Sequence, residues 1–568
     1  MKYKELAELY EKLENTSKRL EKTEILSEFL KKIKNQDSKI IYLLKGKIFP
    51  DYDSREMGIS EQLAIKALSK ASGIQEKEIV KKWKTLGDLG KVAGEFINKK
   101  KQSTLSVKEL TIEKVLENLR KLPELQGKGS VEKKMSLVAE LFTSASSSEA
   151  KYIIRTLLAD LRIGLGDGVL RDAIVWSFLD KDKKEDYILV QEAYDLSTDW
   201  ALVFEKSHSR VSLKNIGLSP GKPLKVMLFP KVSSIEEGFE VVGRPCAMEF
   251  KYDGFRMMIN KDEQGSIRIF TRRLDEVTNQ FPEVKEYAKK YVSGKTFILD
   301  AEAVGYNQKN HKYTSFQDIS QRIKRKYDIE KVQKEFPIEV NVFDILYYNG
   351  KNLISSPFKE RREILEKIIK EKKFQLVLAK QIITDNKEKG EKFYHEALKE
   401  GQEGIMIKGL DKPYKPGARV GYGVKLKPTS NEFDLIITGA EYGTGRRAGW
   451  LTSFDISCRD NGKLLEIGKV STGLKEKESE GVSFKEITEK LKPLITKSEG
   501  KHVLVKPEIV VTVTYQNIQA SPTYSSGFAL RFPRFTRLRP DRSKEDIATL
   551  EEIKRDYQKQ KRNIEGLG

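Results

Sequence analysis

A lysine between two acidic residues, followed closely by an arginine, is the first feature of this sequence that could do covalent chemistry. Lys251 lies in the run Glu249-Phe250-Lys251-Tyr252-Asp253-Gly254-Phe255-Arg256. An ordinary lysine amine is almost fully protonated at pH 7 and must lose its proton before it attacks. Nearby cations disfavour the ammonium form, and phosphate chemistry brings such cations together. We therefore interpret Lys251 as a nucleophile that becomes covalently bonded to a nucleotide.

The same residues also predict a local structure. Asp253-Gly254 favours a tight turn, because this pair tolerates positive φ where a hairpin reverses. Strands over Ala247–Lys251 and Phe255–Ile259 would then form a hairpin, and Arg256 would return close to whatever Lys251 contacts. A solvated hairpin without chemistry is the alternative, since a short motif of this kind also arises by chance.

Two later segments could contact a metal ion or a nucleotide. Asp300 and Glu302 are two residues apart at the end of an apolar strand, and so lie on one strand face. Carboxylate oxygens in this arrangement suit Mg²⁺ or a ribose hydroxyl, although a polar outer face is the alternative. Phe343 is a core aromatic in the simplest interpretation, but a ring at a strand end could also stack on a base.

Three further segments could contact a ligand, and two of them suit phosphates. Glu403 precedes Gly404, where a glycine would allow a ligand to approach closely. Lys425 and Lys427 lie on one face of a short strand, where like charges repel unless an anion lies between them. Near the C-terminus, Leu530–Arg539 contains four arginines around a proline. Such clusters bind phosphates through paired hydrogen bonds.

Length and composition restrict the class of protein. A chain of 568 residues predicts three or four domains. The 105 Lys and Arg residues against 84 Asp and Glu leave a net charge of +21, which suggests a polyanion such as nucleic acid as partner. Ribosomal, membrane-surface and heparin-like partners would give similar totals.

The number of cysteines and the length of the apolar segments indicate the cellular compartment of the protein. Two cysteines cannot form a disulfide framework or a four-cysteine zinc site, which fits a reducing cytoplasm. No run of eighteen apolar residues occurs, and the start of the chain is charged. We expect a cytoplasmic protein without a membrane partner.

The elements that must position these residues fall into three parts. Up to about residue 215, apolar residues recur at helical spacing, as in Leu6, Leu9, Tyr10 and Leu13. In the second such stripe, around Ile153, the residues Lys151, Arg155 and Arg162 fall off the apolar face. A glycine-rich turn at Gly164–Gly168 precedes a predicted helix over Val169–Phe178, and its amides could meet a phosphate; a plain helical corner is the alternative.

The composition changes at Gly217–Pro223, which predicts an extended linker. After it, β-rich runs alternate with helices and predict a mixed α+β domain, with strands at Ala247–Lys251, Phe255–Ile259, Ile267–Thr271, Phe297–Glu302, Ile338–Leu346, Gly404–Lys408 and Val424–Lys427. A last β-rich series predicts a small barrel or sandwich, with strands at Asp434–Ala440, Leu451–Cys458, Leu464–Val470 and Ile509–Val513. Glu551–Arg562 predicts a charged helix or tail.

Taken in order, these segments resemble the covalent nucleotidyltransferases, and specifically the ATP-dependent DNA ligases of the archaeal and eukaryotic replicative type. The resemblance rests on Lys251–Arg256, Thr271-Arg272-Arg273, Leu299–Glu302, Phe343-Asp344, Glu403–Lys408, Lys425-Leu426-Lys427 and Arg531-Phe532-Pro533-Arg534, with Leu161–Gly168 in the helical part. It implies an all-α DNA-binding domain over residues 1–222, an α+β nucleotidyltransferase (adenylation) domain over 223–429, and a β-barrel OB-fold domain with a charged C-terminal helix over 430–568.

The resemblance also implies a three-step reaction. Lys251 attacks the α-phosphate of ATP to give a lysyl-AMP, AMP moves to a DNA 5′-phosphate, and the 3′-hydroxyl at the nick expels it. By resemblance Lys251 is the catalytic residue, Glu302 and Glu403 hold Mg²⁺ with Mn²⁺ as an alternative, and the nucleotide is bound by Glu249, Lys251, Arg256, Arg272, Glu302, Phe343, Arg419, Lys425, Lys427, Arg531 and Arg534.

Other activities share parts of this pattern. An RNA ligase or a capping guanylyltransferase has the lysine motif but not the long helical part, and NAD⁺-dependent ligases need a zinc module that two cysteines cannot supply. A non-catalytic nucleic-acid scaffold would not need the charged site residues. The partner implied is nicked double-stranded DNA, with roles in replication, repair, recombination and cell division.

Two features depart from the family or leave a partner open. The chain has Gly421-Tyr422-Gly423-Val424 where a bulky residue often precedes the paired lysines. A sliding-clamp peptide would need two aromatics after a glutamine and an aliphatic residue, but Gln102 and Leu105 are followed by Lys108 and Glu109, so that partner is poorly matched. We expect a monomer.

Overall fold

The computed structural model describes residues 1–99, 109–314, 319, 322–323, 325, 327–428, 431–444, 447, 449–476 and 481–565. The segment around Gln102 and Leu105, on which the sliding-clamp prediction rests, lies outside this range. The chain forms two compact units, one of Met1–Pro230, Asp253–Lys380 and Lys408–Gly423, the other of Lys231–Tyr252, Gln381–Ile407 and Val424–Gly568.

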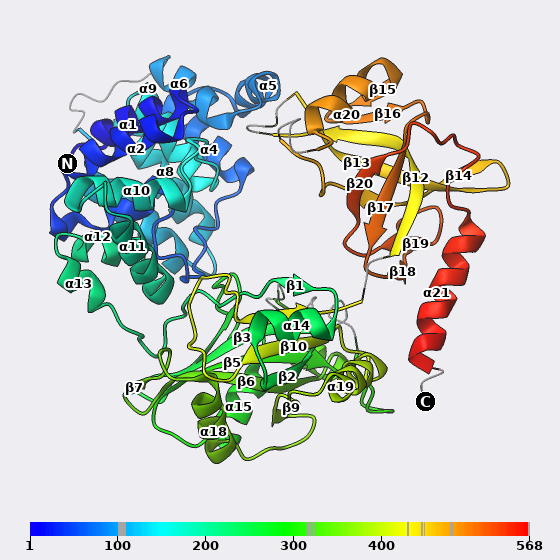
Figure 1. The fold of residues 1–568 in the computed structure, drawn as a ribbon. Helices are drawn as coiled ribbons and strands as arrows, with labels where there is room; N and C mark the ends of the chain where they lie inside the picture. The colour runs from blue at the N-terminus through cyan, green and yellow to red at the C-terminus, as the bar shows by residue number, and fades with distance from the viewer. Residues whose placement is uncertain are drawn as a thin grey trace. The chain divides into compact units, whose positions relative to one another are not determined.

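The first unit begins with a helical region, as predicted (Figure 1). Its α-helices are α1 (Tyr3–Asn15), α2 (Arg19–Leu30), α3 (Ile40–Leu44), α4 (Glu61–Ser72), α5 (Glu76–Leu86), α6 (Leu89–Asn98), α7 (Ile112–Lys121), α8 (Ser130–Ser144), α9 (Ser147–Leu157), α10 (Asp167–Phe178), α11 (Lys184–Ser197), α12 (Trp200–Lys206) and α13 (Arg210–Lys214). The apolar stripe of α1 is fully buried, because helical spacing puts its members on one face. Side-chain caps such as Ser60, Asp88 and Ser146 start several helices.

A twisted sheet follows in the same unit, with the order β4-β3-β5-β6-β7 and β8 paired to β6. Its strands are β3 (Phe255–Lys261), β4 (Ile267–Thr271), β5 (Phe297–Gly305), β6 (Ile338–Tyr348), β7 (Lys351–Asn352) and β8 (Leu376–Leu378). Helices α15 (Pro282–Tyr291) and α18 (Phe358–Ile368) supply Val284 and Leu365 to the core on one face. Leu299 and Ala301 of β5 point into that core, so Asp300 and Glu302 share the opposite face, as predicted.

The second unit contains a sheet with the order β1-β11-β10-β2-β9. The strands are β1 (Lys231–Val232), β2 (Cys246–Lys251), β9 (Gln381–Thr384), β10 (Gly404–Gly409) and β11 (Gly423–Leu426). Helices α14 (Ile235–Val242) and α19 (Lys387–Lys399) pack beside it (Figure 1). Together the two sheets give the mixed α/β region that the sequence predicted.

The C-terminal part of the second unit is a curled antiparallel sheet, consistent with an OB fold. The long strand β12 (Asn431–Tyr442) pairs with three others, β13 (Leu451–Asp460), β16 (His502–Val505) and β17 (Val510–Tyr515). Further strands and helices are β14 (Lys463–Val470), β15 (Ile495–Glu499), β18 (Ile518–Ala520), β19 (Phe528–Leu530), β20 (Arg534–Leu538), α20 (Phe484–Leu491) and α21 (Leu550–Glu565). Register shifts within β12–β13 and β13–β14 add bends, which a sheet needs in order to curl. The predicted charged C-terminal helix is confirmed as α21.

The predicted hairpin around Asp253-Gly254 is wrong. Strand β2 pairs antiparallel with β9, and β3 pairs with β4 and β5, so the chain changes sheet at this point instead of reversing. Gly254 is required for space and not for a left-handed backbone, because a Cβ there would lie 2.2 Å from the carbonyl oxygen of Ala303.

No helix in the described ranges is long and apolar enough to cross a membrane.

Candidate active site

Lys251 lies at the end of β2 in a cluster of one carboxylate and two amines. Its Nζ is 2.6 Å from Oε2 of Glu403, and Nζ of Lys427 is 3.0 Å from the same oxygen. The backbone amide of Glu403 also donates to the carbonyl of Lys251 at 2.8 Å. These contacts fix the amine of Lys251 beside a second cation, at side chains that are only partly exposed.

The charges of this cluster act on one another. Burial alone raises the pKa of Glu403, but the ammonium groups of Lys251 and Lys427 outweigh burial and hold that pKa below its ordinary value. Glu403 is therefore ionised at neutral pH, and its one carboxylate pairs with two lysines. The cluster keeps an excess of positive charge, which suits a phosphate.

Gly404 was predicted to allow a ligand to approach, and this reason is wrong. A Cβ at Gly404 would lie 2.2 Å from the carbonyl oxygen of Leu426, and its φ is 138°. The neighbouring β11 backbone takes the space. The glycine lets β10 and β11 pack closely and so sets Glu403 beside Lys427.

Glu249 and Lys425 lie on the same sheet. The Glu249 side chain is almost fully buried, and Nε2 of Gln381 on the paired strand β9 donates to its Oε1 at 2.8 Å. Val424 and Leu426 of β11 are buried, so strand alternation puts Lys425 on the opposite, partly exposed face with Lys427. Gln381 was not identified from the sequence, because nothing local connects it to Glu249.

Arg256 forms the centre of a second polar cluster, in the first unit. Its Nε donates to Oδ1 of Asp300 at 2.8 Å, and its Cζ lies 5.3 Å from the centre of the Phe343 ring. Arg256 and Glu302 are directly opposite on β3 and β5. Burial alone lowers the pKa of Arg256, but the Asp300 carboxylate outweighs burial and raises that pKa above its ordinary value. The cluster thus combines a fixed cation, an aromatic ring and a half-buried carboxylate.

Phe343 is only half buried, and cations lie near its ring. Nζ of Lys408 is 4.9 Å from the ring centre, within the range of a cation–π contact. The next residue, Asp344, is fixed by the buried guanidinium of Arg361 at 2.7 Å and 3.0 Å. A half-exposed ring on a rigid strand can stack on a planar ligand.

The four other arginines predicted to bind the nucleotide do not belong to either of the two polar clusters around Lys251 and Arg256. Arg272 follows β4 and Arg419 precedes β11, and both are exposed. Arg531 is buried beside Phe532, with its Cζ 5.0 Å from that ring, and Arg534 on β20 is exposed.

The other two arginines of the predicted cluster have acidic partners within the curled sheet. Arg537 pairs with Glu432 at 3.0 Å, and Arg539 pairs with Asp434 at 2.6 Å. These two ion pairs stabilise that sheet.

Glu302 and Glu403 are the residues expected to hold a metal ion. In the described part of the chain, no group of three or more His, Cys, Asp or Glu side chains is placed to hold one. This fits Mg²⁺ chemistry with nucleotides, in which one or two carboxylates bind the ion and phosphates and water complete its shell.

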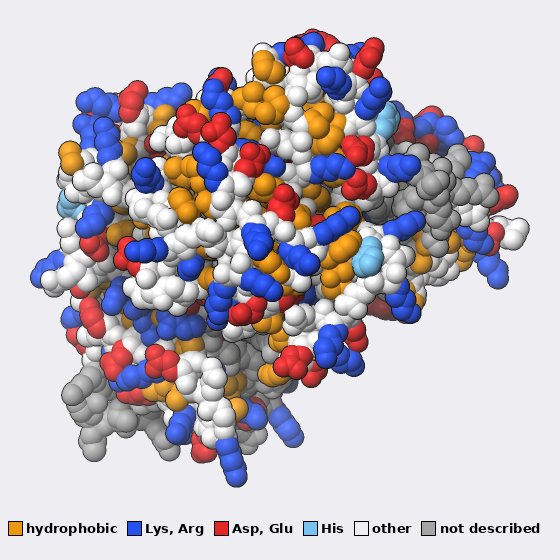
Figure 2. Space-filling model, turned by 90° about the horizontal axis from the view of Figure 1, so that it is seen from below, with side chains coloured by type: hydrophobic (Ala, Val, Ile, Leu, Met, Phe, Trp, Pro, Cys, Tyr) orange, Lys and Arg blue, Asp and Glu red, His pale blue; other side chains and the backbone are white. Residues whose placement is uncertain are grey.

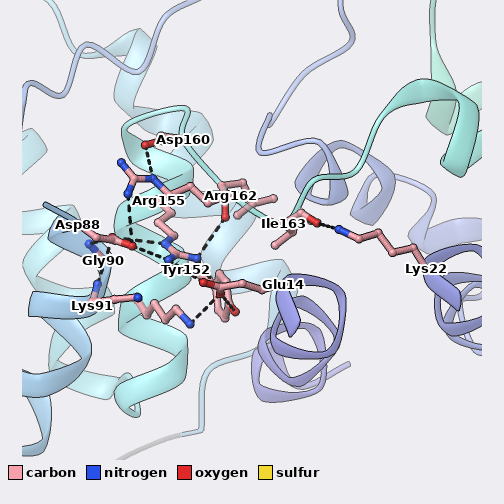
Figure 3. A network of polar contacts seen from close by, with 12 residues as sticks. Glu14, Lys22, Asp88, Gly90, Lys91, Tyr152, Arg155, Asp160, Arg162 and Ile163 are labelled. Carbon is pink, nitrogen blue, oxygen red and sulfur yellow. Dashed lines mark hydrogen bonds and ion pairs between the residues drawn. The ribbon is translucent and has the colours of Figure 1, made fainter. Parts of the chain in front are cut away.

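The glycine-rich turn before α10 is held by two buried cations from elsewhere in the helical region (Figure 3). Arg155 bonds Glu14 at 2.9 Å and Asp88 at 2.5 Å, and also donates to the carbonyl of Leu161 at 3.4 Å. Nζ of Lys22 donates to the carbonyls of Ile163 and Gly164. In a planar trans peptide the carbonyl and the amide of the next residue point in opposite directions. The carbonyls of Ile163 and Gly164 point to the buried Lys22, so we infer that the amides of Gly164 and Leu165 point away from it.

This network corrects the prediction that Arg155 falls off the buried face of its helix. Its side chain is 3% exposed, while Arg162, on the turn itself, is 44% exposed. Its carboxylate partners are 141 and 67 residues away in sequence, so no local pattern could reveal them.

Comparisons with known proteins cover almost the whole chain. Family models described as "DNA ligase N terminus", "ATP dependent DNA ligase domain" and "ATP dependent DNA ligase C terminal region" match residues 2–175, 226–427 and 447–542. The chain therefore belongs to the family of ATP-dependent DNA ligases. It seals nicks in DNA at the expense of ATP.

Within that family the chain is of the archaeal type. It is 44% identical to the DNA ligase of Nanoarchaeum equitans (strain Kin4-M), over 99% of this chain and 100% of its relative. It is 41% identical to the DNA ligase of Thermococcus onnurineus (strain NA1), over 99% of both chains. A solved structure described as "Pmar-Lig_PreS3" shares the fold, with a TM-score of 0.54 and 17% identity over 94% of this chain and 99% of that one.

Proposed function

We propose that this ligase works through a covalent lysyl-AMP at Lys251, followed by an adenylated 5′-phosphate on nicked duplex DNA. The observation that carries the proposal is the fixed cluster of Lys251, Glu403 and Lys427. Phosphoryl transfer needs positioning and charge neutralisation more than covalent machinery. A lysine held beside a second lysine provides both.

The proposed first step is attack of the Lys251 amine on the α-phosphate of ATP. A P–N bond forms, the P–O bond to the β-phosphate breaks, diphosphate leaves, and the amine loses its proton to solvent or to the departing oxygens. The contact with Glu403 at 2.6 Å holds the Lys251 amine in place for this attack. Lys425 and Lys427 then neutralise the α-phosphate.

We assign the base and ribose contacts to the two clusters. Glu249, fixed by Gln381, would accept a hydrogen bond from the adenine amino group, and Phe343 would stack on the base. Arg256 and Glu302 would hold the ribose, while Arg272 and Arg419 are exposed and suit phosphate.

In the second step AMP passes from Lys251 to a DNA 5′-phosphate. An oxygen of that 5′-phosphate forms a new P–O bond to the phosphorus of AMP, the P–N bond to Lys251 breaks, and the amine of Lys251 takes up a proton. In the third, the 3′-hydroxyl at the nick attacks that 5′-phosphate and AMP leaves. Glu302 and Glu403 are the residues that would hold Mg²⁺, with Mn²⁺ as an alternative. The ion would supply charge neutralisation on phosphate oxygens.

Arg534 is expected to act in the first step alone. Arg531 and Arg534 would orient the departing diphosphate when the C-terminal domain closes over the site. Arg534→Ala should lower the rate of enzyme adenylation about a hundredfold, because a desolvated arginine on a leaving phosphate contributes strongly. Sealing of a nick that already carries the 5′-adenylate should stay near wild type. Both rates are measured in single-turnover assays.

The matched control for Arg534 is Arg537→Ala, on the same strand. Arg537 is already bound to Glu432 at 3.0 Å, so its loss should leave adenylation within about threefold of wild type. Equal loss in both variants would refute a specific role for Arg534.

Nicked duplex DNA is the substrate, and we propose that the helical region binds its backbone. The net charge of +21 supports this role, and so does the start of the glycine-rich turn Gly164–Gly168. We infer that the amides of Gly164 and Leu165 face outward, because the carbonyls of Ile163 and Gly164 accept from Lys22. On the face that Figure 2 draws from below, Lys and Arg side chains are widely spread among acidic ones, in line with the net charge of +21 of the whole chain. Binding should therefore depend on many phosphate contacts.

Affinity for nicked duplex should fall steeply with salt. Each neutralised phosphate contributes about −0.9 to the slope of log K against log salt, so six contacts would weaken binding about a thousandfold between 50 and 200 mM. Fluorescence anisotropy with a labelled nicked duplex measures the slope. A slope near zero would contradict binding through the DNA backbone.

We retain the domain division of residues 1–222, 223–429 and 430–568 as part of this proposal, together with a monomeric enzyme. A ligase that consumes ATP acts where DNA and ATP are found, inside the cell, in replication, repair and recombination.

A further inference from the structure

The guanidinium of Arg256 has most of its hydrogen-bonding capacity in use before any ligand arrives. Nε donates to Oδ1 of Asp300 at 2.8 Å, Nη2 donates to Oδ2 of Asp300 and to the hydroxyl of Tyr414, and Nη1 donates to the carbonyl of Met227 at 2.9 Å. A guanidinium has five N–H donors in a planar fork. Among the described residues, one donor on Nη1 has no protein acceptor. The orientation of that donor is therefore set by the other four.

Tyr414 connects the groups that set this orientation. Its hydroxyl donates to Oδ2 of Asp300 at 2.9 Å and accepts from Nη2 of Arg256 at 3.1 Å and from the backbone amide of Met227 at 3.0 Å. A hydroxyl has one donor and two acceptor sites, so all three are filled. Burial, and then the charge of Asp300, raise the pKa of Tyr414 well above its ordinary value, which keeps the hydroxyl protonated.

The ring of Tyr414 is itself fixed. Its side chain is 2% exposed and packs in a cluster with Leu224, Met227 and Val420. Its backbone amide donates to the carbonyl of Ile354 at 2.8 Å. A buried ring with an anchored backbone has one rotamer available, so its hydroxyl is a stationary reference point.

The segment around Met227 is fixed in the same way. Leu228 donates to the carbonyl of Ala418 at 2.9 Å and accepts from the amide of Val420 at 3.1 Å. The carbonyl of Met227 is therefore as stationary as the hydroxyl of Tyr414. The predicted extended linker is thus followed by a segment that is hydrogen-bonded at Leu228 and contributes an acceptor to Arg256.

We propose that Tyr414 is a positioning residue for ATP binding, whose hydroxyl orients Arg256 toward the nucleotide without touching it. The inference rests on the proposed role of Arg256 at the ribose. Removal of the hydroxyl leaves Nη2 of Arg256 without one acceptor and the Met227 amide without its partner. The guanidinium is then held only by Asp300 and by the carbonyl of Met227, a residue whose own amide has lost its partner, so the remaining donor is less closely fixed.

Tyr414→Phe tests the inference, because it removes only the hydroxyl. The KM for ATP in self-adenylation, followed with α-labelled ATP, should rise about tenfold, the effect of losing one hydrogen bond to a charged group. The rate constant at saturating ATP should stay within about twofold, since the hydroxyl lies away from the reacting atoms. A merely structural tyrosine would lower the thermal midpoint and the active fraction and leave KM unchanged.

Tyr422→Phe is the matched control. Tyr422 lies in the same segment, and its buried hydroxyl has no hydrogen-bond partner among the described residues. Its removal should leave KM unchanged. An equal rise of KM in both variants would overturn the inference, because it would show a general response of this segment.

A double-mutant cycle with Arg256→Lys separates the inference from the function it rests on. Arg256→Lys keeps the charge beside Asp300 but loses the fork, and should raise the KM for ATP by itself. Tyr414→Phe should then add nothing further in the Arg256→Lys background. If Arg256→Lys leaves KM unchanged, the ribose role of Arg256 is wrong and the inference falls with it. If Arg256→Lys raises KM, but Tyr414→Phe has no effect in the wild type or adds its full effect in the Arg256→Lys background, only the role of Tyr414 is wrong.

Discussion

Lys251→Ala should form no covalent adenylate with Mg²⁺ and α-labelled ATP, whereas the wild type should give an acid-labile adduct. We expect that Lys427, the other amine of the cluster, cannot replace Lys251 as the nucleophile. Lys427 is bound to Glu403 at 3.0 Å and lies just after a different strand, β11. We expect a loss of adduct of at least about ten-thousandfold, the limit of such an assay and a typical cost for removing a nucleophile. Labelled protein is measured after denaturing electrophoresis.

The same variant should still seal a nick whose 5′-phosphate is already adenylated. That substrate bypasses the attack by Lys251 and needs only the later transfer. Sealing within about a hundredfold of wild type would place the defect in the first step and show that the variant is folded. Persistent labelling of Lys251→Ala would refute the assignment of the nucleophile. Labelling of the wild type with GTP or NAD⁺ in place of ATP would show that the enzyme uses another nucleotide.

Arg155→Met should destabilise the helical region by about 3 kcal/mol, since it leaves buried carboxylates without their cation. Arg155 bonds Glu14 at 2.9 Å and Asp88 at 2.5 Å with a side chain that is 3% exposed. For a region of some two hundred residues this lowers the unfolding midpoint by roughly 10 °C. Differential scanning calorimetry measures it. The control Arg162→Met, on a partly exposed side chain, should shift the midpoint far less.

The effect of Arg155→Met should also depend on pH. Burial alone raises the pKa of Glu14, but Arg155, Lys151 and Tyr152 together lower it to about 2 from 4.5. A carboxyl whose pKa is lowered by folding adds stability above its unfolded pKa and loses it as the pH falls through the folded value. The wild type should therefore lose stability between about pH 4.5 and pH 2, and Arg155→Met should lose less there. Parallel acid profiles would contradict this role of Arg155.

Much of the fold follows from local patterns. The strand predicted at Phe297–Glu302 is part of β5, and the strand predicted at Val424–Lys427 overlaps β11, which ends at Leu426. These predictions hold because the alternation of side chains along a strand depends only on neighbours in sequence. The helical start and the charged C-terminal helix hold for the same reason.

Pairing partners could not be predicted in this way. Asp253-Gly254 has the sequence of a hairpin turn, yet β2 pairs with β9, more than a hundred residues away in sequence. The glycines at 254 and 404 have the residue type expected of a turn or a ligand contact, but the backbones of Ala303 and Leu426 explain them. Which strands become neighbours depends on the burial of the whole sheet.

The sequence by itself determined the chemistry that this protein carries. One lysine beside an Asp-Gly-x-Arg segment, followed by spaced carboxylates, paired lysines and terminal arginines, was enough to indicate a ligase, because the reacting side chains are local features of short motifs. The tertiary structure alone decided how those side chains are held. It set Tyr414 against Asp300, 114 residues apart, and Arg155 between two carboxylates. The cost of burying a charge or a hydroxyl is met only by partners that folding brings together from distant parts of the chain.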